Sequence, residues 1–394
     1  MKIAVDASCW ANRRGYGRYI HGLLPALISA DRSNDYVLIA DRQTSACIPA
    51  DLASISVADT GQAATEGARS GGSRSMRDVW KMSRTASKEK ADVLFFPSVY
   101  TYFPVFTRAT VIVAIHDVIA EDFPEFVFPS RRERFLWTSK VSMARWQADD
   151  IVTVSRHARD GIVRRFGVDP SKVTVVSEAA DASFRPLEPS QIHPAQFLPL
   201  GIAERDRILL YVGGVNPHKN LSRLIQALAG ARNADPALED LKLVICGDVE
   251  REHFTPGLAH VRETVRAESM QQQVVFTGYL PDGDVCQLMN RASALALPSL
   301  AEGFGLPAVE AAACGTPVIA TRNSPLPQIL EGGGIFVDPL DTAAMAEAIR
   351  RIFTDAPFQR QLAHVALERA SQLTWSAAAE AMIGLLARIE ADRR

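Results

Sequence analysis

One turn carries the most specific pattern in this chain: Ser299-Leu300-Ala301-Glu302-Gly303-Phe304-Gly305-Leu306-Pro307-Ala308-Val309-Glu310. It follows a short apolar run, Ala294–Leu297, which predicts a buried strand, and it leads into a predicted helix. Two glycines in the turn allow the backbone to approach a ligand closely. The N–H groups that begin the helix then form an anion site suited to a diphosphate.

Two carboxylates flank this turn. Glu302 lies in the loop, where it can accept hydrogen bonds from sugar hydroxyls, and Glu310 lies one helical turn further on, where it can bind the two hydroxyls of a ribose. An ordinary helix start also favours acidic residues, because the helix dipole stabilises them there. The complete string, with both glutamates and Pro307, favours a ligand site.

The same alternation of short apolar runs with longer amphipathic segments extends over the whole chain. It predicts βα units on parallel sheets covered on both faces. We expect strands at Lys2–Ala7, Tyr36–Ala40, Val93–Phe96, Thr110–Ile115, Ile151–Ser155, Val173–Ser177, Ile208–Gly213, Leu241–Cys246, Val274–Thr277, Ala294–Leu297, Pro317–Ala320 and Ile335–Val337.

A chain of 394 residues is too long for one ordinary core, so we expect two domains. Glu178–Gly201 contains four prolines and little periodicity, which is typical of an interdomain linker. We therefore expect an N-terminal α/β domain over 1–195, joined by a final helix in 375–394, and a C-terminal α/β domain over 196–374.

The composition of the chain argues against several classes of protein. The formal charge of −2 argues against nucleic-acid binding. Five scattered cysteines form no CxxC pair, which argues against a disulfide framework or a zinc site and favours a reducing cytoplasm. We expect no signal peptide at the N-terminus, because Asp6 interrupts its apolar run. Prolines in the longest apolar stretch, Val93–Ile115, favour strands over a membrane helix.

Glu302 to Glu310 resembles the Glu-x7-Glu motif of the retaining glycosyltransferases of family GT4, and the resemblance covers nearly the whole chain. It implies a GT-B fold, in which two Rossmann-like domains face each other across a deep cleft. It also implies that Glu302 contacts the transferred sugar and that Glu310 binds the ribose. The backbone that meets sugar and phosphate is then that of Gly303, Phe304, Gly305 and Leu306.

A second glycine turn precedes a predicted helix: Tyr211-Val212-Gly213-Gly214-Val215-Asn216-Pro217-His218-Lys219-Asn220. A lysine at the mouth of a helix can neutralise a diphosphate leaving group. The resemblance assigns this role to Lys219 and places Gly213 and Gly214 against the donor. The family usually has an arginine after the first glycine, where this chain has Gly214, so a protonated His218 is the candidate for the second positive contact.

His116 and Asp117 end another predicted strand, and open α/β sheets bind ligands at the carboxyl ends of their strands. The resemblance places His116 near the donor sugar and the reaction centre, with Asp117 beside it. It also implies that Phe276-Thr277-Gly278-Tyr279-Leu280 meets the nucleobase, which assigns Gly278 and Tyr279 to the donor site.

The loop Asn12-Arg13-Arg14-Gly15-Tyr16-Gly17-Arg18 follows the first strand. Alone it is weak, because the third glycine of a dinucleotide fingerprint is missing. It resembles the family's first glycine loop, which faces donor phosphate and acceptor. We assign Gly17 to the donor and Gly15, Tyr16, Arg18 and the strand-end Ser155 to the acceptor side. By contrast, Val176-Ser177-Glu178-Ala179-Ala180-Asp181 departs from the family's Pro-Asn-Gly-Val-Asp.

These residues predict sugar transfer without a metal or other cofactor, because no Asp-x-Asp metal motif ends a strand. The expected catalytic residues are His116, Asp117, Lys219 and Glu302. The style of the sequence resembles bacterial enzymes of polysaccharide and lipopolysaccharide assembly and favours GDP-mannose as donor, with a UDP-sugar as the alternative. The acceptor is a glycan or a lipid-linked saccharide.

Two basic segments leave alternatives open. Asp59–Ser75 and the lysines and arginines up to Lys90 suit either a surface loop with a solvated helix or an acceptor-side loop at an anionic membrane. Arg131–Trp146 suits either an interfacial helix or ordinary packing of a core-facing stripe, and we expect packing. The expected location is the cytoplasm, with peripheral contact at the inner membrane.

Two other functions remain compatible with the motifs: a GT-B sugar-nucleotide epimerase and a non-catalytic nucleotide-sugar-binding subunit. The glycine loop with His116-Asp117 favours a transferase over the epimerase, and the set of His116, Lys219, Glu302 and Glu310 argues against a non-catalytic subunit.

Overall fold

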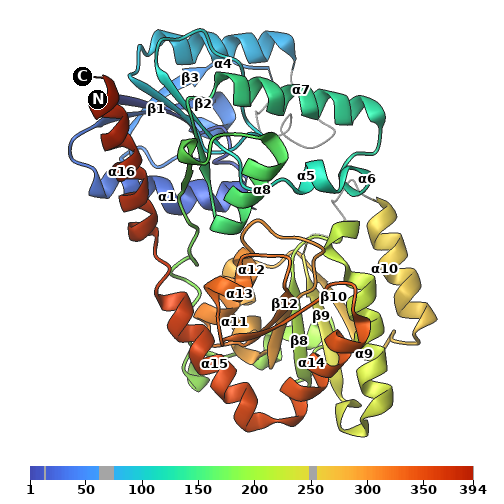
Figure 1. The fold of residues 1–394 in the computed structure, drawn as a ribbon. Coiled ribbons are helices and arrows are strands. Elements are labelled where there is room, and N and C mark those ends of the chain that lie inside the picture. Colours follow the sequence, from blue (N-terminus) through green and yellow to red (C-terminus); the bar gives the residue numbers. More distant parts are fainter. Residues whose placement is uncertain (13–14, 62–74, 248–254, 394) are drawn as a thin grey trace. The chain divides into compact units, whose positions relative to one another are not determined.

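The computed structural model describes residues 1–12, 15–61, 75–247 and 255–393. The chain forms two compact units: Met1–Glu178 with Thr374–Arg394, and Ala179–Leu373 (Figure 1). Arg13, Arg14 and the central part of the expected Asp59–Ser75 loop lie outside the described residues. Across the described ranges, no helix has both the length and the apolar character needed to cross a bilayer.

A seven-stranded sheet forms the centre of the first unit, in the order β3-β2-β1-β4-β5-β6-β7. Every neighbouring pair is parallel. The strands are β1 (Lys2–Asp6), β2 (Asp35–Asp41), β3 (Ser54–Ala58), β4 (Val93–Phe96), β5 (Thr110–Ala114), β6 (Asp150–Thr153) and β7 (Val173–Val175). All four residues of β4 are buried, as a strand covered on both faces requires.

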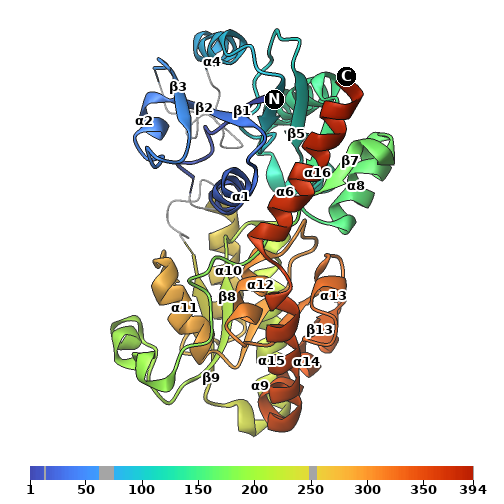
Figure 2. The ribbon, with the colours of Figure 1, turned by 90° about the vertical axis from the view of Figure 1, so that its left-hand side faces the viewer.

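Helices cover both faces of this sheet. On one side, α1 (Tyr16–Ala30) packs against α16 (Trp375–Arg393), which crosses it (Figure 2). On the other side, α4 (Met76–Lys88), α7 (Arg131–Gln147) and α8 (Arg156–Phe166) share one apolar cluster with the strands. Short helices lie at α2 (Arg42–Ser45), α5 (Ile119–Asp122) and α6 (Pro124–Val127), with a 3-10 turn at Pro170–Lys172.

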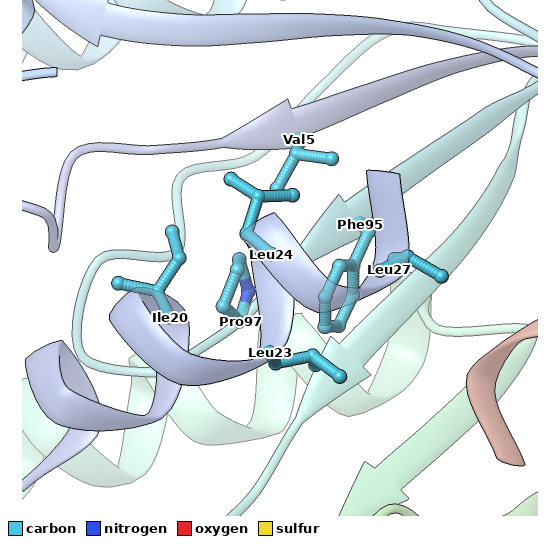
Figure 3. A pocket seen from close by; sticks show the side chains of 7 residues that line it. All are labelled: Val5, Ile20, Leu23, Leu24, Leu27, Phe95 and Pro97. Carbon is cyan, nitrogen blue, oxygen red and sulfur yellow. The ribbon is translucent and has the colours of Figure 1, made fainter. Parts of the chain in front are cut away.

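The strand side chains alternate between these two layers. Ala4 belongs to the cluster with α4 and α7, whereas Val5 faces α1, as the period of two in a strand dictates. Figure 3 shows the α1 side, where Val5, Phe95 and Pro97 lie against apolar side chains of the helix. No water molecule fits into this seam, so it belongs to the packed core.

The second unit has a six-stranded parallel sheet in the order β10-β9-β8-β11-β12-β13. Its strands are β8 (Arg207–Val212), β9 (Leu241–Cys246), β10 (Val274–Gly278), β11 (Ala294–Leu297), β12 (Val318–Thr321) and β13 (Gly334–Val337). From β8 the strands β9 and β10 follow toward one edge of the sheet, whereas β11, β12 and β13 follow toward the other edge. The strand order therefore reverses between the neighbouring strands β8 and β11. Such a switch point is where open α/β sheets bind ligands.

Seven helices of the second unit lie in its described part: α9 (Leu221–Ala234), α10 (Thr255–Ala267), α11 (Asp282–Arg291), α12 (Leu306–Ala313), α13 (Leu326–Ile329), α14 (Thr342–Thr354) and α15 (Ala356–Ser371). Among them, α9 packs against α14 and α10, and α12 packs against α15. Short 3-10 turns occupy Pro189–Gln191, Pro194–Leu200, Pro217–Lys219 and Pro236–Leu238.

The proline-rich segment after Glu178 belongs to the second unit, whereas the sequence places the boundary after residue 195. Two side chains of α11 explain the difference. Asn290 accepts a hydrogen bond from the backbone of Leu187, and Gln287 accepts one from the backbone of His193. The part of the segment from Leu187 to His193 is therefore fixed to α11 at both ends.

The expectation that α7 turns its apolar side chains to the core is wrong for most of the helix. Only Val141 and Ala144 are buried on α7. Phe135 and Trp146 are exposed, as are Leu136 and Met143. The core takes only the narrow side of α7 that lies on β5, and the wider apolar face points away from the sheet.

Candidate active site

The turn between β11 and α12 has a geometry that only glycine satisfies. Gly305 caps α12 with φ of 91°, and a Cβ there would meet the Leu326 side chain at 2.9 Å. Phe304 and Leu306 are buried, so their side chains hold the turn against the core. This leaves the backbone as the part of the turn that can approach a ligand, as predicted for an anion site.

The turn after β8 lies beside the first one. Asn220, with φ of 59°, joins the 3-10 turn to α9, and its amide donates to the carbonyls of Pro298 and Pro339 at 3.0 and 2.7 Å. The backbone N–H of Leu300 donates to the His218 carbonyl at 2.8 Å. These bonds fix the turn after β8 against the turn after β11 at the switch point of the sheet.

Lys219 and Glu302 form an ion pair between the two turns. The Lys219 Nζ lies 2.8 Å from Glu302 Oε1, and the Ser299 hydroxyl donates to the same oxygen at 2.5 Å. Burial opposes ionisation of Glu302, but the charge and hydrogen bond of Lys219, with that of Ser299, lower its pKa overall. An ammonium and a carboxylate therefore stand side by side, both ionised, at the carboxyl end of the sheet.

A protonated His218, the candidate for the second positive contact, is disfavoured in this structure. Burial lowers its pKa to about 3, and the positive charge of Lys219 acts in the same direction. The imidazole is consequently neutral at physiological pH, and Lys219 supplies the positive charge of this turn. The sequence shows that His218 stands next to a lysine, but it does not show that the ring is buried.

The remaining glycines of the donor set lie at the ends of neighbouring strands. Gly213 has φ of 151°, and its N–H donates to the Cys246 carbonyl at 2.9 Å. Gly214 accepts from the Tyr211 hydroxyl at 2.5 Å. Gly278 has φ of 72° and accepts from the N–H of Gly247 at 3.1 Å, which binds the ends of β9 and β10 together.

Gly247 is a residue that the sequence analysis does not single out. A Cβ on it would lie 2.1 Å from the carbonyl oxygen of Gly213, so only glycine lets β8 and β9 end this close together. Its position directly after the predicted strand Leu241–Cys246 was the available signal. Next to this strand end, Tyr279 is exposed, whereas Glu310 is buried within α12.

In the first unit, His116 follows β5 and is held at both ring nitrogens. Nε2 lies 2.9 Å from the Pro97 carbonyl, and Nδ1 lies 3.5 Å from Glu178 Oε1. Burial alone would lower the pKa of His116, but the hydrogen bond and negative charge of Glu178 raise it overall. The neighbouring Asp117 accepts a hydrogen bond from the backbone of Ile119 at 2.9 Å.

Glu178 is the second candidate site residue that sequence reasoning missed. Its side chain is 7 % exposed, and its carboxylate lies against His116 although the two residues are 62 positions apart in the sequence. The only signal was the departure of Val176–Asp181 from the family string. This chain carries a carboxylate within the segment where the family has its Asn-Gly turn.

The glycine loop of the first unit begins α1. Gly15 precedes the helix with φ of 44°, and a Cβ on Gly17 would meet the Asn12 carbonyl oxygen, so the loop packs onto its own backbone. Tyr16 stacks on Tyr100 with ring centroids 5.1 Å apart. Arg18 is half-buried on α1.

Ser155 accepts a hydrogen bond from the Ala158 N–H at 3.0 Å and so caps α8. The predicted residues thus fall into two groups within separate units. Lys219, His218, Glu302 and the glycine turns gather in the second, and His116, Asp117, Ser155 and the Gly15–Arg18 loop belong to the first. Among the described residues, no three His, Cys, Asp or Glu side chains cluster as metal ligands do.

Comparisons with known proteins agree with this arrangement. Residues 14–184 match the model of Glycosyltransferase Family 4, and residues 194–369 match that of Glycosyl transferases group 1. D-inositol 3-phosphate glycosyltransferase of Corynebacterium diphtheriae is 30% identical over 59% of this chain and 54% of its own length. O-antigen chain mannosyltransferase B of Escherichia coli is 27% identical over 67% of this chain and 66% of its own.

The chain spans about half the length of the first curated relatives that it matches. Among solved structures, HepE of Anabaena in complex with UDP and glucose superposes with a TM-score of 0.74 over 98% of this chain and 100% of that one, at 19% identity. Each unit is Rossmann-like, with a parallel sheet and glycine turns at its strand ends, and the two family models match adjoining parts of the chain. The chain therefore belongs to the family 4 glycosyltransferases with the GT-B type of fold.

Proposed function

We propose that this glycosyltransferase moves a hexose, with retention of its anomeric configuration, from a nucleotide diphosphate sugar to a glycan or a lipid-linked saccharide. The observation that carries the proposal is the pair of Lys219 and Glu302 between two glycine turns at the switch point of the second sheet. One ammonium and one carboxylate, both ionised, match a ligand with an anionic diphosphate and a hydroxyl-rich sugar.

Sugar transfer develops two charges that the protein must stabilise, one on the leaving diphosphate and one on the anomeric carbon. Lys219 and the backbone N–H groups of Gly303–Leu306 take the negative charge in our proposal. Glu302 accepts hydrogen bonds from the sugar hydroxyls and lies close enough to Lys219 to hold its ammonium in place. Glu310 holds the ribose, and Gly278 with Tyr279 contacts the base.

We propose a front-face reaction without a resident metal. The acceptor oxygen forms the new bond to the anomeric carbon as the bond to the phosphate oxygen breaks, and the acceptor proton passes to that departing oxygen. His116 contributes positive charge near the sugar in our proposal, because Glu178 raises its pKa and favours its charged form, and Asp117 lies beside it. A chelator is expected to leave the rate unchanged, and loss of activity on chelation would refute this part.

GDP-mannose is the donor that we favour. The relationship to an O-antigen mannosyltransferase supports mannose, whereas the similarity to HepE, solved with UDP and glucose, supports a UDP-sugar as the alternative. Thermal denaturation with a panel of GDP- and UDP-sugars separates them. A donor present at a hundredfold excess over its Kd should add about 2.7 kcal/mol to the free energy of unfolding.

The decisive test compares two ion pairs of the second unit. Lys219→Ala should lower kcat by about 100-fold or more, as loss of one charge-stabilising donor does. Lys242→Ala is the control, because Lys242 pairs with Asp206 at 2.7 Å and has the same 21 % side-chain exposure as Lys219. Equal loss of activity in both variants would mean that Lys219 is only structural.

Product analysis separates the other two functions. A sugar-nucleotide epimerase would convert the donor to its isomer without any acceptor, and a binding subunit would be stabilised by the donor without turning it over. We further propose that the enzyme works in the cytoplasm, in peripheral contact with the inner membrane, since a lipid-linked acceptor lies there.

A further inference from the structure

Exposed apolar side chains gather on one part of the first unit. The described residues include eleven large apolar side chains that are exposed. Seven of them belong to α4, α7 and the loop between β4 and β5: Met76, Trp80, Phe106, Phe135, Leu136, Met143 and Trp146. Large apolar side chains that gather on one part of a surface mark an interaction site, whereas single scattered ones need no explanation.

On α7 these side chains follow helical spacing. Phe135, Met143 and Trp146 stand at i, i+8 and i+11, which places them within one face of the helix. Phe135 is 70% exposed and Trp146 is 82% exposed. Since Val141 and Ala144 bind α7 to the core, this face points away from the sheet.

The loop after β4 extends the face at the end of α7. Gln147 accepts from the Val105 N–H at 3.1 Å and donates to the Val105 carbonyl at 2.7 Å. This clamp fixes the neighbouring Phe106, 87% exposed, beside the helix end that carries Trp146. Two hydrogen bonds thus hold the backbone next to the exposed Phe106 ring.

The outer face of α4 continues the same layer (Figure 1). Met82 and Ala86 place α4 in the apolar cluster that also anchors α7, so both helices cover one side of the sheet. Trp80 is 57% exposed on α4, and the Arg84 guanidinium lies 5.2 Å from the centre of its ring. Aromatic rings with arginine partners are typical of side chains that lie in lipid headgroups.

The fully exposed charges on these helices are all positive. Their exposed ionisable residues are Arg77, Arg84 and Lys88 on α4 and Arg131, Arg132 and Arg134 on α7. The acidic residues of the two helices are Asp78 and Glu133, both in first turns and neither fully exposed. Because the whole chain has a net charge of −2, this positive charge is a local feature.

We propose that the outer faces of α4 and α7, with Phe106, form a docking surface for an anionic lipid bilayer. The arginines pair with lipid phosphates, and the aromatic rings enter the interface, the two contributions that hold an amphipathic helix in the plane of a membrane. This inference deepens the peripheral location proposed above, and it is independent of which nucleotide sugar is used.

Co-sedimentation of the full chain with vesicles tests the surface. The protein should bind vesicles of phosphatidylcholine mixed with phosphatidylglycerol and should not bind phosphatidylcholine alone. In the double variant Arg131→Glu/Arg132→Glu, binding should fall at least about fivefold per arginine, the factor that corresponds to about 1 kcal/mol per cationic side chain at the surface. Arg360→Glu, an exposed arginine of the second unit, is the matched control.

The apolar part has its own pair of variants. Phe135→Ser/Trp146→Ser should lower binding roughly tenfold or more, since each ring leaves water on docking, whereas Leu340→Ser, 62% exposed in the second unit, should not. Brominated lipid should quench the fluorescence of the wild-type protein, and Trp146→Phe should remove part of that quenching. Thermal melting confirms that the variants fold.

Three results would overturn the proposal: no binding of the wild type to the mixed vesicles, equal binding by all variants, or no quenching by brominated lipid. Self-association that is lost in Phe135→Ser/Trp146→Ser without any vesicle binding would assign the face to a protein contact and would also overturn it. Donor turnover measured in buffer without lipid tests the proposed function separately, so the two failures can be told apart.

Discussion

His116 depends on a neighbour that comes from another segment of the chain. Its Nδ1 faces Glu178, its Nε2 faces the Pro97 carbonyl, and the Tyr19 ring packs edge-on against it with centroids 4.8 Å apart. Tyr19 is buried with a pKa far above its usual value, so it stays neutral. The charge on the imidazole is therefore governed by burial, which opposes it, and by Glu178 and Asp117, which favour it.

We predict that Glu178→Gln inverts the pH dependence of stability near neutrality. The folded pKa of His116 is raised, so its stabilisation is complete below the unfolded value of about 6.5 and is lost as pH rises through the folded value. Without Glu178, burial lowers the folded pKa, and stability should instead increase as pH rises toward about 6.5. At about pH 6 the variant should lose about 1.5–3 kcal/mol.

Thermal melting from about pH 5 to 8 measures this slope. Glu89→Gln is the control, because Glu89 pairs with Lys2 at 2.8 Å and no histidine takes part. A variant whose melting temperature follows the wild-type curve in this range would show that Glu178 has no influence on the imidazole.

For single residues, the sequence predicted membership of a motif better than it predicted the surroundings of a side chain in the fold. It named Lys219 and Glu302, 83 residues apart, because each stands in a glycine turn after a strand, and the structure places them 2.8 Å apart. It could not name Glu178, which meets His116 only through the tertiary path of the chain. It also could not foresee the neutral His218, because burial in a packed turn is not a property of local sequence.

Among the elements, α1 and α16 pack closely against each other. Gly22 on α1 faces the indole of Trp375 on α16, and a Cβ at Gly22 would lie 2.0 Å from the ring. Glycine inside a helix normally weakens it. Here it permits a close approach that a larger residue would prevent.

Gly22→Ala should therefore destabilise the protein by about 1–3 kcal/mol, the usual cost of forcing a methyl into a packed core. Gly384→Ala is the matched control, because it lies inside α16 with open space around its Cβ position. That substitution should stabilise the protein by about 0.5–1 kcal/mol. Chemical denaturation reports both, and a gain at Gly22 would show that the Trp375 ring moves aside without cost.

The elements themselves were largely predictable. The apolar runs locate every strand in the described part of the chain except β3, whose residues Ser-Ile-Ser-Val-Ala alternate and lie at the edge of the sheet. A buried parallel strand is recognised in the sequence by its continuous apolar run, whereas a short edge strand has no such run. For α7 the sequence left two orientations open, because an apolar stripe shows amphipathicity and not which face meets the core.

For the whole molecule, the main feature is the path of the chain through the two units. The first unit is built from two separate stretches, Met1–Glu178 and Thr374–Arg394, with the whole second unit between them. The returning helix α16 buries Met382, Leu385, Leu386 and Ile389. Its Arg388 and Arg393 pair with Asp150 and Asp92 at 2.5 and 2.9 Å.

Removal of residues 374–394 should destabilise the first unit by more than about 5 kcal/mol, since each large apolar side chain contributes about 1.5–3 kcal/mol by burial. Limited proteolysis should then cleave the first unit and leave residues 179–373 intact. Arg388→Ala/Arg393→Ala is the control and should cost no more than about 1 kcal/mol per pair, because both arginines are exposed. If the truncated chain resists protease as the full one does, α16 is dispensable.

The position of α16 also determines the order in which the two units can be completed during synthesis. The ribosome makes α1 early, but the helix that covers it emerges only after all of Ala179–Leu373. At about 5–20 residues per second, the side of α1 that packs on α16 waits roughly ten seconds or more for its cover. The unit encoded second is thus the first that can reach its final form, and the nascent first unit is the natural client of a chaperone.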